Sequence, residues 1–239
     1  MLKVENLETW GFEHAIRGMR NPMNSWDKSD SKWDIMSDSV DIVPFFLIGE
    51  NDLDLMKRLY KSGNEHRTYA RMIYAWMDIT APLYWWKEMD RYTVGKSQVS
   101  CSTMHKIAAK EFELDDFSHE HLSDYSIAHA LEPTIDTLNH QRELYLTDKS
   151  KTWWWQLIQL LPSSYNQKRT VCMSYEVIFK IIKERTGHKL DEWNDFIEEL
   201  KKLPYVKAII GEDETLAFGE NIYVLGKIIN DAIGEKDGN

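Results

Sequence analysis

The sequence contains little cysteine, proline or glycine. Its 239 residues include two cysteines, six prolines and 11 glycines. Two cysteines are too few for the disulfide framework of a small secreted protein, so Cys101 and Cys172 are expected to be reduced thiols in a cytoplasmic protein. Because the chain has no low-complexity stretch and no linker-like composition, we expect a single domain over residues 1–239.

The chain also lacks long apolar runs and an excess of positive charge. No apolar run approaches the roughly 20 residues of a membrane-spanning helix, and residues 1–14 have no signal-peptide core. The net charge of -10 excludes a general binder of nucleic-acid backbones, which needs a basic surface. A single anionic ligand held by a local group of cations is compatible with this composition.

Aromatic residues, in contrast, are abundant, with ten tryptophans and 11 tyrosines. They form two consecutive clusters, Tyr84–Trp86 and Trp153–Trp155. Three consecutive residues on a helix point in different directions, so at most one or two in each cluster could stack on a ligand ring. Packing in the core or at a subunit interface is the commoner use, and a large interface in a homo-oligomer is compatible with this content.

Apolar residues recur at helical spacing in several segments. The spacing predicts helices over residues 51–61, 126–146 and 174–185, and another that starts near Leu190. Residues 1–50 are expected to be irregular, residues 69–79 fit either a strand or a buried helix, and residues 219–233 fit a final packing helix. These segments predict an α+β fold in which helices pack on a modest mixed sheet.

Residues 81–106 combine hydroxyl, thiol and cationic groups. Pro82 marks the start of a helix, which we expect to end near Gly95 and to lead into a polar loop. Hydroxyl and thiol groups in the loop would donate hydrogen bonds to a bound anion, with Ser100, Cys101 and Ser102 as the best candidates. The cations of this stretch are Lys87, Arg91, Lys96 and Lys106.

Residues 153–193 bring further cations to the ends of predicted elements. A polar turn after Pro162 carries Arg169, and the helix over 174–185 ends at Arg185. Arg185 follows Ile181 and Ile182 by four and three residues, so its side chain starts from the buried edge of that helix and needs an anionic partner or a bound anion. Alternatively, Arg185 is a C-terminal cation that interacts with the helix dipole.

Together these two stretches resemble the flavin-dependent thymidylate synthases, also called thymidylate synthase-complementing proteins. Pro82 and Leu83 stand as far before Arg91 as the family's Pro-Leu stands before the first Arg of its Arg-His-Arg signature. Cys101 falls at the family's active-site Ser. Leu161, Pro162, Thr170 and Tyr175 lie in a segment similar to the family's later Leu-Pro and Tyr motif, and Arg185 lies at its dUMP-orienting Arg.

An upstream segment extends the resemblance, which covers roughly residues 50–200. Residues 63–68 are similar to the family's Gly-His-x-Ser/Thr-Pro-Phe-Glu-His turn, which places His66 and Thr68 at flavin-site positions. Ser174 and Glu176 stand where the family has a flavin-contacting Asn and Arg. The resemblance also implies FAD as cofactor, a folate one-carbon donor and a homotetramer with shared active sites.

The resemblance implies three groups of site residues. Arg185 would polarise the pyrimidine ring and Cys101 would stand at the catalytic position. A nucleotide would be bound by Lys87, Arg91, Ser100, Ser102 and Arg169. The flavin would be bound by His66, Thr68, Arg91 and Ser174.

Several signature residues differ from the family pattern. The Arg-His-Arg signature reads Arg91-Tyr92-Thr93, the family's Ser-x-Arg-Tyr reads Cys101-Ser102-Thr103-Met104, and Ile158 occupies the position of a phosphate-binding Arg. Each lost charge-assisted hydrogen bond removes about 1.5–3 kcal/mol. Two functions therefore stay open. One is a divergent enzyme that transfers a methyl or one-carbon group to a deoxyuridine nucleotide with reduced flavin. The other is a non-catalytic nucleotide-binding or protein-interaction module on the same scaffold.

Two further patterns suggest chemistry less strongly. His119 and His121 lie among acidic residues and could bind a metal, but such a pair in an acidic surface loop is usually solvated, so we expect no metal site. A Cys101–His105 dyad rests only on proximity in the sequence.

Overall fold

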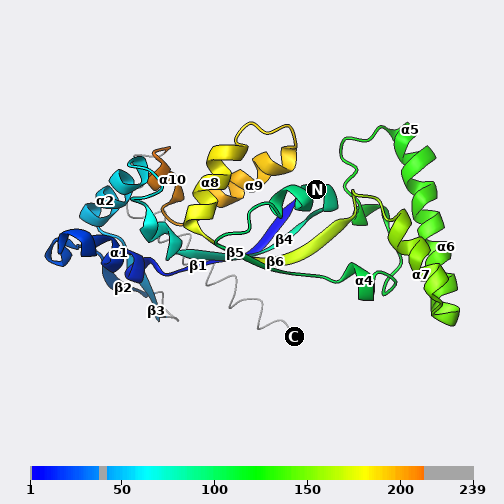
Figure 1. Ribbon diagram of the computed structural model, residues 1–239, viewed down its shortest axis with the longest axis horizontal. Helices are drawn as coiled ribbons and strands as arrows, with labels where there is room; N and C mark the ends of the chain where they lie inside the picture. Colours follow the sequence, from blue (N-terminus) through cyan, green and yellow to red (C-terminus); the bar gives the residue numbers. More distant parts are fainter. Residues whose placement is uncertain (1, 38–41, 213–239) are drawn as a thin grey trace. The chain divides into compact units, whose positions relative to one another are not determined.

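The computed structural model describes residues 2–37 and 42–212 (Figure 1). Its strands are β1 (Lys3–Trp10), β2 (Lys32–Ser37), β3 (Ile42–Leu47), β4 (Tyr74–Pro82), β5 (Lys96–Ser100) and β6 (Asn166–Ser174). Its α-helices are α1 (Phe12–Arg20), α2 (Glu50–Lys61), α3 (Leu83–Met89), α4 (Thr103–Lys106), α5 (Asp124–Ser126), α6 (Glu132–Asp148), α7 (Lys151–Leu160), α8 (Tyr175–Arg185), α9 (Asp191–Lys201) and α10 (Val206–Ile210). Short 3₁₀ turns include η3 (Thr68–Arg71).

The strands form two sheets. A four-stranded sheet has the order β1-β4-β6-β5, and β2 pairs with β3 in an antiparallel hairpin with Lys32 opposite Leu47. The predicted α+β class is confirmed. Within the described residues, no helix is both long and apolar enough to cross a membrane.

Strand β4 resolves the ambiguity of residues 69–79. Ala75, Met77 and Ile79 are buried, whereas Trp76 between them is exposed. This period of two is that of a strand with one face against the core. The segment is therefore a 3₁₀ turn followed by a strand, and not a buried helix.

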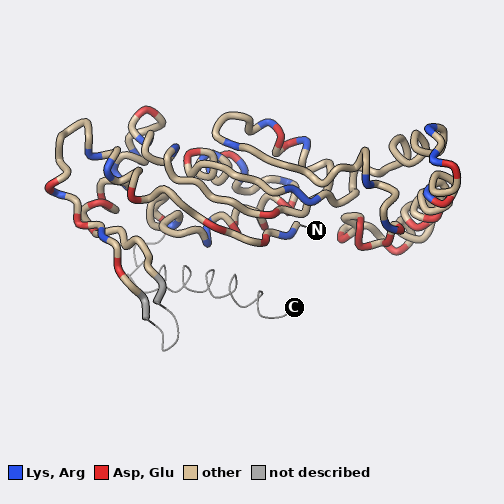
Figure 2. The backbone as a smooth tube through the Cα atoms, turned by 90° about the horizontal axis from the view of Figure 1, so that it is seen from below, with Lys and Arg blue, Asp and Glu red and all other residues tan. Residues whose placement is uncertain are grey.

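The chain divides into two compact units. Unit 1 contains residues 1–3, 78–92 and 98–170, and unit 2 contains residues 4–77, 93–97 and 171–239. The assignment of residues 1–239 to one domain stays a prediction. Acidic and basic residues are interspersed along the chain in both units (Figure 2).

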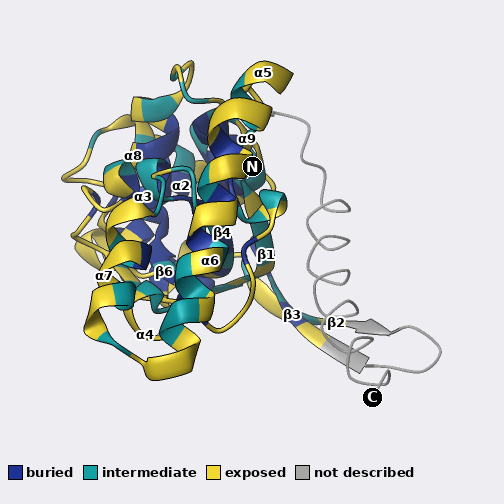
Figure 3. Ribbon diagram, turned by 90° about the vertical axis from the view of Figure 1, so that its right-hand side faces the viewer, coloured by how far each residue is buried: buried dark blue, intermediate teal, exposed yellow. Residues whose placement is uncertain are grey.

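The core of unit 1 includes the buried faces of helices α6 and α7. Its buried cluster joins residues of these helices to the segment before them and consists of Ile107, Ala108, Phe112, Phe117, Leu131, Ile135, Leu138 and Leu157. Many residues of α6 outside this cluster are exposed (Figure 3). The helix predicted over 126–146 is confirmed, except that it begins with a π-helical turn, Ile127–Leu131. Pro133 follows that turn and has no N–H to donate to the carbonyl of His129, which fits the local widening.

The core of unit 2 is built on α8 and α9. The predicted inner stripe of α8 is confirmed, because Val177, Ile178, Ile181 and Ile182 are all buried. On α9 the buried apolar residues are Trp193, Phe196, Ile197 and Leu200. This spacing places all four on one helix face.

Two predictions about the ends of the chain have different outcomes. The prediction that residues 1–50 are irregular was wrong, since this segment contains β1, α1 and the β2–β3 hairpin. The buried residues of α1 include Phe12, Ala15, Ile16 and Met19. Their helical spacing could have been recognised in the sequence. The helix predicted over 219–233 lies outside the described residues.

Candidate functional site

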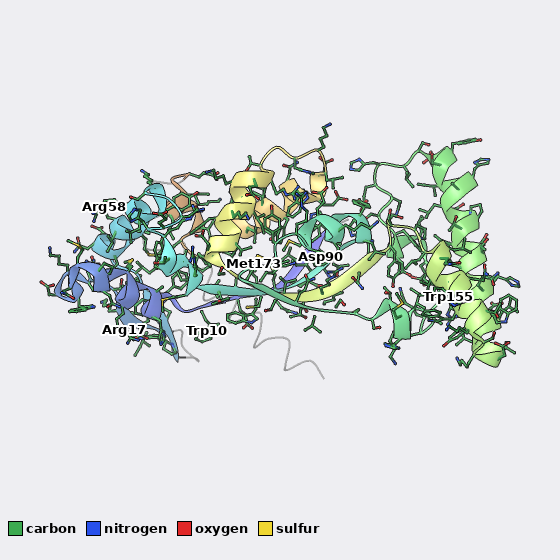
Figure 4. All side chains as sticks on the ribbon, in the orientation of Figure 1. Trp10, Arg17, Arg58, Asp90, Trp155 and Met173 are labelled. Carbon is green, nitrogen blue, oxygen red and sulfur yellow. The ribbon has the colours of Figure 1, made fainter. Side chains whose placement is uncertain are left out.

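In unit 1, three segments meet at the carboxylate of Asp90. Arg169, on β6, donates a hydrogen bond from Nη1 to Oδ1 of Asp90 at 2.8 Å. Gln98, on β5, donates from Nε2 to the same oxygen at 2.7 Å. Asp90 itself follows the last residue of α3 and is labelled in Figure 4. We call this meeting point of residues 87–91, 98–102 and 167–169 the junction.

Arg169 is held on several sides within the junction. Its guanidinium lies 4.2 Å from the ring centroid of the buried Trp86. Its Nε donates to Oε1 of Gln167 at 2.9 Å. Burial lowers the pKa of the Arg169 guanidinium, and the Asp90 carboxylate acts in the opposite direction. The side chain is 11% exposed, so it reaches solvent only at one edge.

Cys101 is fixed beside β6 through its backbone. Its N–H donates to the carbonyl of Lys168 at 2.9 Å, and its own carbonyl accepts from Nε2 of Gln167 at 2.8 Å. The side chains of Ser100 and Cys101 are exposed. Ser102 caps α4, because its Oγ accepts a hydrogen bond from the backbone N–H of His105 at 3.1 Å. The hydroxyl proton of Ser102 remains available to a ligand.

Two cations face solvent at the α3 side of the junction. Lys87 and Arg91 are both exposed; Lys87 lies on α3, and Arg91 lies in the turn that follows the helix. Within residues 2–37 and 42–212 neither side chain forms an ion pair. The six predicted residues of unit 1 therefore lie on the three segments that meet at Asp90: Lys87, Arg91, Ser100, Cys101, Ser102 and Arg169.

The local structure of the junction differs from the sequence prediction in two respects. The helix after Pro82 ends at Met89 and not near Gly95, and part of the expected polar loop is strand β5. Likewise, the expected polar turn of residues 163–169 ends in strand β6. Pairing between β5 and β6 in the sheet explains why both polar segments are strands, since short polar strands show no apolar periodicity in the sequence.

In unit 2, His66 and Thr68 flank a buried arginine. Both are exposed, whereas Arg67 between them is buried. Nε of Arg67 lies 2.8 Å from Oε2 of Glu176, and its guanidinium lies 5.3 Å from the ring centroid of Tyr60. Arg67 was not predicted as a site residue. The sequence carried no signal for it, because its partner lies far along the chain.

Ser174 immediately precedes α8 and is buried. Its backbone N–H donates to the carbonyl of Gly95 at 2.9 Å. Gly95 has φ +77°, and a Cβ at this position would lie 2.9 Å from Oγ of Ser174. A side chain at residue 95 would therefore be strained and crowded. Ser174 thus has a packing role, and its role toward a flavin stays a prediction.

Arg185 is the last residue of α8 and is half-buried. Its guanidinium lies 4.6 Å from the ring centroid of Trp193, and Nη1 lies 3.1 Å from Nε2 of His188. Ser174 and Arg185 lie at opposite ends of α8, about 16 Å apart along its axis at 1.5 Å per residue. That Arg185 faces the same site as Arg91 and Cys101 stays a prediction.

The groups in unit 2 fit the uncharged part of a flavin better than its diphosphate. His66 and Thr68 offer exposed polar groups to ribityl hydroxyls or ring heteroatoms. Glu176, at the position of a family Arg, cancels the charge of Arg67. A diphosphate at this place would meet a neutral ion pair, so its cations would have to come from elsewhere in the protein.

The weaker chemical patterns of the sequence gain no support in the described part of the chain. No group of three His, Cys, Asp or Glu side chains in it could hold a metal ion. Nδ1 of His119 instead lies 2.8 Å from the carbonyl of Phe117. Cys101 and Cys172 are both free thiols, and among the described residues no hydrogen bond joins Cys101 to His105.

Comparisons with known proteins give a match in structure but not in sequence. No protein-family model matches the chain, and no curated protein sequence matches it. Two crystal structures of thymidylate synthase X from Helicobacter pylori, both with FAD and dUMP, match at 18% sequence identity with TM-scores of 0.57 and 0.58. They cover 93% and 92% of this chain, and 99% and 98% of theirs.

A third solved structure supports the same fold. The UMP/dUMP methylase PolB from Streptomyces cacaoi, bound with 5-bromo-UMP, matches at 12% identity with a TM-score of 0.57, over 89% of this chain and 92% of its own. At these identities the likeness establishes the fold. The chain therefore has the fold of the flavin-dependent thymidylate synthases, as its motifs predicted.

Proposed function

We propose that the protein binds a pyrimidine nucleotide at the junction and modifies it as a divergent flavin-dependent thymidylate synthase-like enzyme. The observation that carries this proposal is the meeting at Asp90 of the segments that bear Lys87, Arg91, residues 100–102 and Arg169, together with the shared fold. Cations and hydroxyl donors in one place suit a phosphate group. The reaction class is transfer of a methyl or one-carbon group to the pyrimidine.

In this proposal the protein supplies binding and orientation. Lys87 and Arg91 attract the phosphate, and the hydroxyls of Ser100 and Ser102 donate hydrogen bonds to it. Arg185 orients and polarises the pyrimidine ring, and Cys101 stands beside the phosphate donors. A folate is the one-carbon donor that the resemblance implies.

FAD is the cofactor of this proposal. Reduced flavin, when bound, supplies the hydride for the reaction. His66 and Thr68 would hold its uncharged part, supported by the buried Ser174. Arg91, in unit 1, is the fourth flavin-binding residue that the resemblance implies.

Absorbance and calorimetry test the proposal. Purified protein is expected to show flavin absorbance or to acquire it with added FAD, and to bind dUMP. Arg91→Ala is expected to weaken dUMP binding by about 10-fold or more, the value of one charge-assisted bond. Equal dUMP affinity in wild type and Arg91→Ala would remove Arg91 from the site. Protein that binds neither FAD nor dUMP would overturn the function.

A non-catalytic nucleotide-binding or protein-interaction module is the second candidate. It is favoured by the internal neutralisation of Arg67 by Glu176 and of Arg169 by Asp90. A colourless protein that binds dUMP but does not turn it over with FAD, NADPH and methylenetetrahydrofolate would select this alternative.

We also propose a homotetramer and a cytoplasmic location. The motivation for the tetramer is the family resemblance and the abundance of exposed tryptophans, such as Trp10 and Trp155. Light scattering tests it. A single species of 28.2 kDa at micromolar concentration would overturn it.

A further inference from the structure

Asp90 is an acid in the middle of a group of cations and hydroxyls. It is followed directly by Arg91, and its carboxylate accepts hydrogen bonds from both Arg169 and Gln98. It also follows the last residue of α3, where the helix dipole disfavours a negative charge. The charge of the Asp90 carboxylate is therefore stabilised by its partners in the junction and not by the helix dipole.

The Asp90–Arg169 pair differs in exposure between its two members. Asp90 is 44% exposed and Arg169 is 11% exposed. Arg169 is fixed by Trp86 and Gln167, whereas water reaches the carboxylate. A ligand anion that approached Arg169 would therefore have to displace the Asp90 carboxylate or lie beside it, and like charges at such a distance repel each other.

The opposite face of β6 provides a comparison. Asp78 accepts a hydrogen bond from Thr170 at 2.6 Å and lies 3.3 Å from Nζ of Lys168. Successive residues of a strand point to opposite faces. Asp78 therefore pairs with the two neighbours of Arg169 in the strand but not with Arg169 itself.

We propose that Asp90 is a specificity-determining residue that limits the number of phosphate groups on the ligand of the junction, so that the site accepts a nucleoside monophosphate and rejects the diphosphate and triphosphate. The proposal rests on the proposed nucleotide binding. One phosphate can be neutralised by Lys87 and Arg91. Each further phosphate meets the Asp90 carboxylate, and the guanidinium of Arg169 is already occupied.

The test is a set of dissociation constants for deoxyuridine, dUMP and dUTP, measured by calorimetry. Wild type is expected to bind dUMP more tightly than dUTP. Asp90→Asn, which keeps the shape of the side chain, is expected to bind dUTP about 10-fold or more tightly than wild type does, because it releases a charge-assisted bond for the ligand. Its affinity for deoxyuridine is expected to be unchanged.

Asp78→Asn is the matched control. It removes the same charge from a carboxylate on β4 whose partners, Lys168 and Thr170, lie on the opposite face of β6 from Arg169, and it is expected to change dUTP affinity by less than about twofold. A gain equal to that of Asp90→Asn would indicate a general charge effect and would overturn the proposal. In the Arg169→Gln background, the gain from Asp90→Asn is expected to shrink, which a purely structural role of Asp90 would not produce.

Two further measurements distinguish failure of the role proposed for Asp90 from misfolding of the variant and from failure of the proposed function. If Asp90→Asn does not fold, Gln98→Lys tests the same idea, because it gives Asp90 a second cation and is expected to raise dUTP affinity. If wild type binds no nucleotide, the proposed function fails, and inorganic pyrophosphate becomes the probe. Tighter pyrophosphate binding by Asp90→Asn than by wild type and Asp78→Asn would still support the role of Asp90, whereas equal binding by all three would overturn it.

Discussion

The carboxylate of Asp52 lies 2.7 Å from Nε of Arg20, and both side chains are buried. Asp52 also accepts hydrogen bonds from the hydroxyls of Ser29 and Ser31, at 2.7 and 2.6 Å, and from the backbone N–H of Asp30 and Ser31. One carboxylate on α2 therefore fixes both α1 and the segment before β2. Such a group is costly to bury unless all its partners are present.

We predict that Asp52→Asn lowers the free energy of unfolding by about 3–5 kcal/mol, since it leaves Arg20 buried without its counter-charge. Urea unfolding at pH 7 measures this loss. Asp54→Asn is the control, because Asp54 forms an exposed ion pair with Arg58 on the same helix, and its loss is expected to cost about 0.5 kcal/mol or less. Equal effects of the two substitutions would contradict the role assigned to Asp52.

The same carboxylate predicts a pH dependence. Burial acts to raise the pKa of Asp52, but hydrogen bonds from Ser31, Ser29 and Arg20 outweigh it and hold the pKa below its ordinary value. A lowered pKa stabilises the folded protein above the unfolded value of about 3.9, and this stabilisation is lost as the pH falls toward the folded value. The stability difference between wild type and Asp52→Asn is therefore expected to be constant from pH 7 to 5 and to shrink below about pH 4.

The packing of unit 1 predicts how much stability is lost when a cavity is made at Leu138. Leu138 is fully buried on α6, whereas Leu146 on the same helix is 41% exposed. Leu138→Ala is expected to destabilise the protein by about 2–5 kcal/mol, and Leu146→Ala by about 0.5 kcal/mol or less. Urea unfolding followed by circular dichroism compares the two. A small effect at Leu138 would contradict the cluster beneath α6 and α7.

The two thiols are expected to react at different rates. Cys101 is exposed, whereas Cys172 is partly buried, and burial raises the pKa of the Cys172 thiol. Because the thiolate is the reactive form, alkylation of Cys172 needs a higher pH. Mass spectrometry after treatment with iodoacetamide at pH 7.5 is expected to show Cys101 modified first, with Cys101→Ser as the control for assignment.

The position of Cys101 in the junction predicts protection by a nucleotide. Saturating dUMP is expected to slow alkylation of Cys101 several-fold without changing that of Cys172. An unchanged rate at Cys101 under saturating dUMP would place the nucleotide elsewhere.

We predict that Arg185 contributes to binding of the pyrimidine ring of the ligand and not of its phosphate. Its guanidinium stacks on Trp193, and a lysine cannot reproduce this planar contact. If Arg185 polarises the pyrimidine, Arg185→Lys weakens deoxyuridine and dUMP binding by the same factor. Lys189→Ala, which removes an exposed cation in the turn after α8, is the control and leaves both affinities unchanged. A loss confined to dUMP would instead assign Arg185 to the phosphate.

The sequence by itself determined the α+β class and the inner faces of α8 and α9, and it singled out six residues on the segments that form the junction. Val177, Ile178 and Ile181 recur at helical spacing, which is a local pattern and needs no tertiary contact to be recognised. The segment after Pro82 was singled out by its run of hydroxyl, thiol and cationic side chains. Its motifs resemble those of the flavin-dependent thymidylate synthases, and this resemblance predicted the fold that the solved structures share.

Only the tertiary structure decided which charges are paired. Asp90 meets Arg169, and Arg67 meets Glu176, across long separations in sequence. Helical and strand periodicities report burial along one element, and they carry no information about a partner on another element. For the same reason the short polar strand β5 looked like a loop, because the hydrogen bonds that make it a strand come from its neighbour in the sheet.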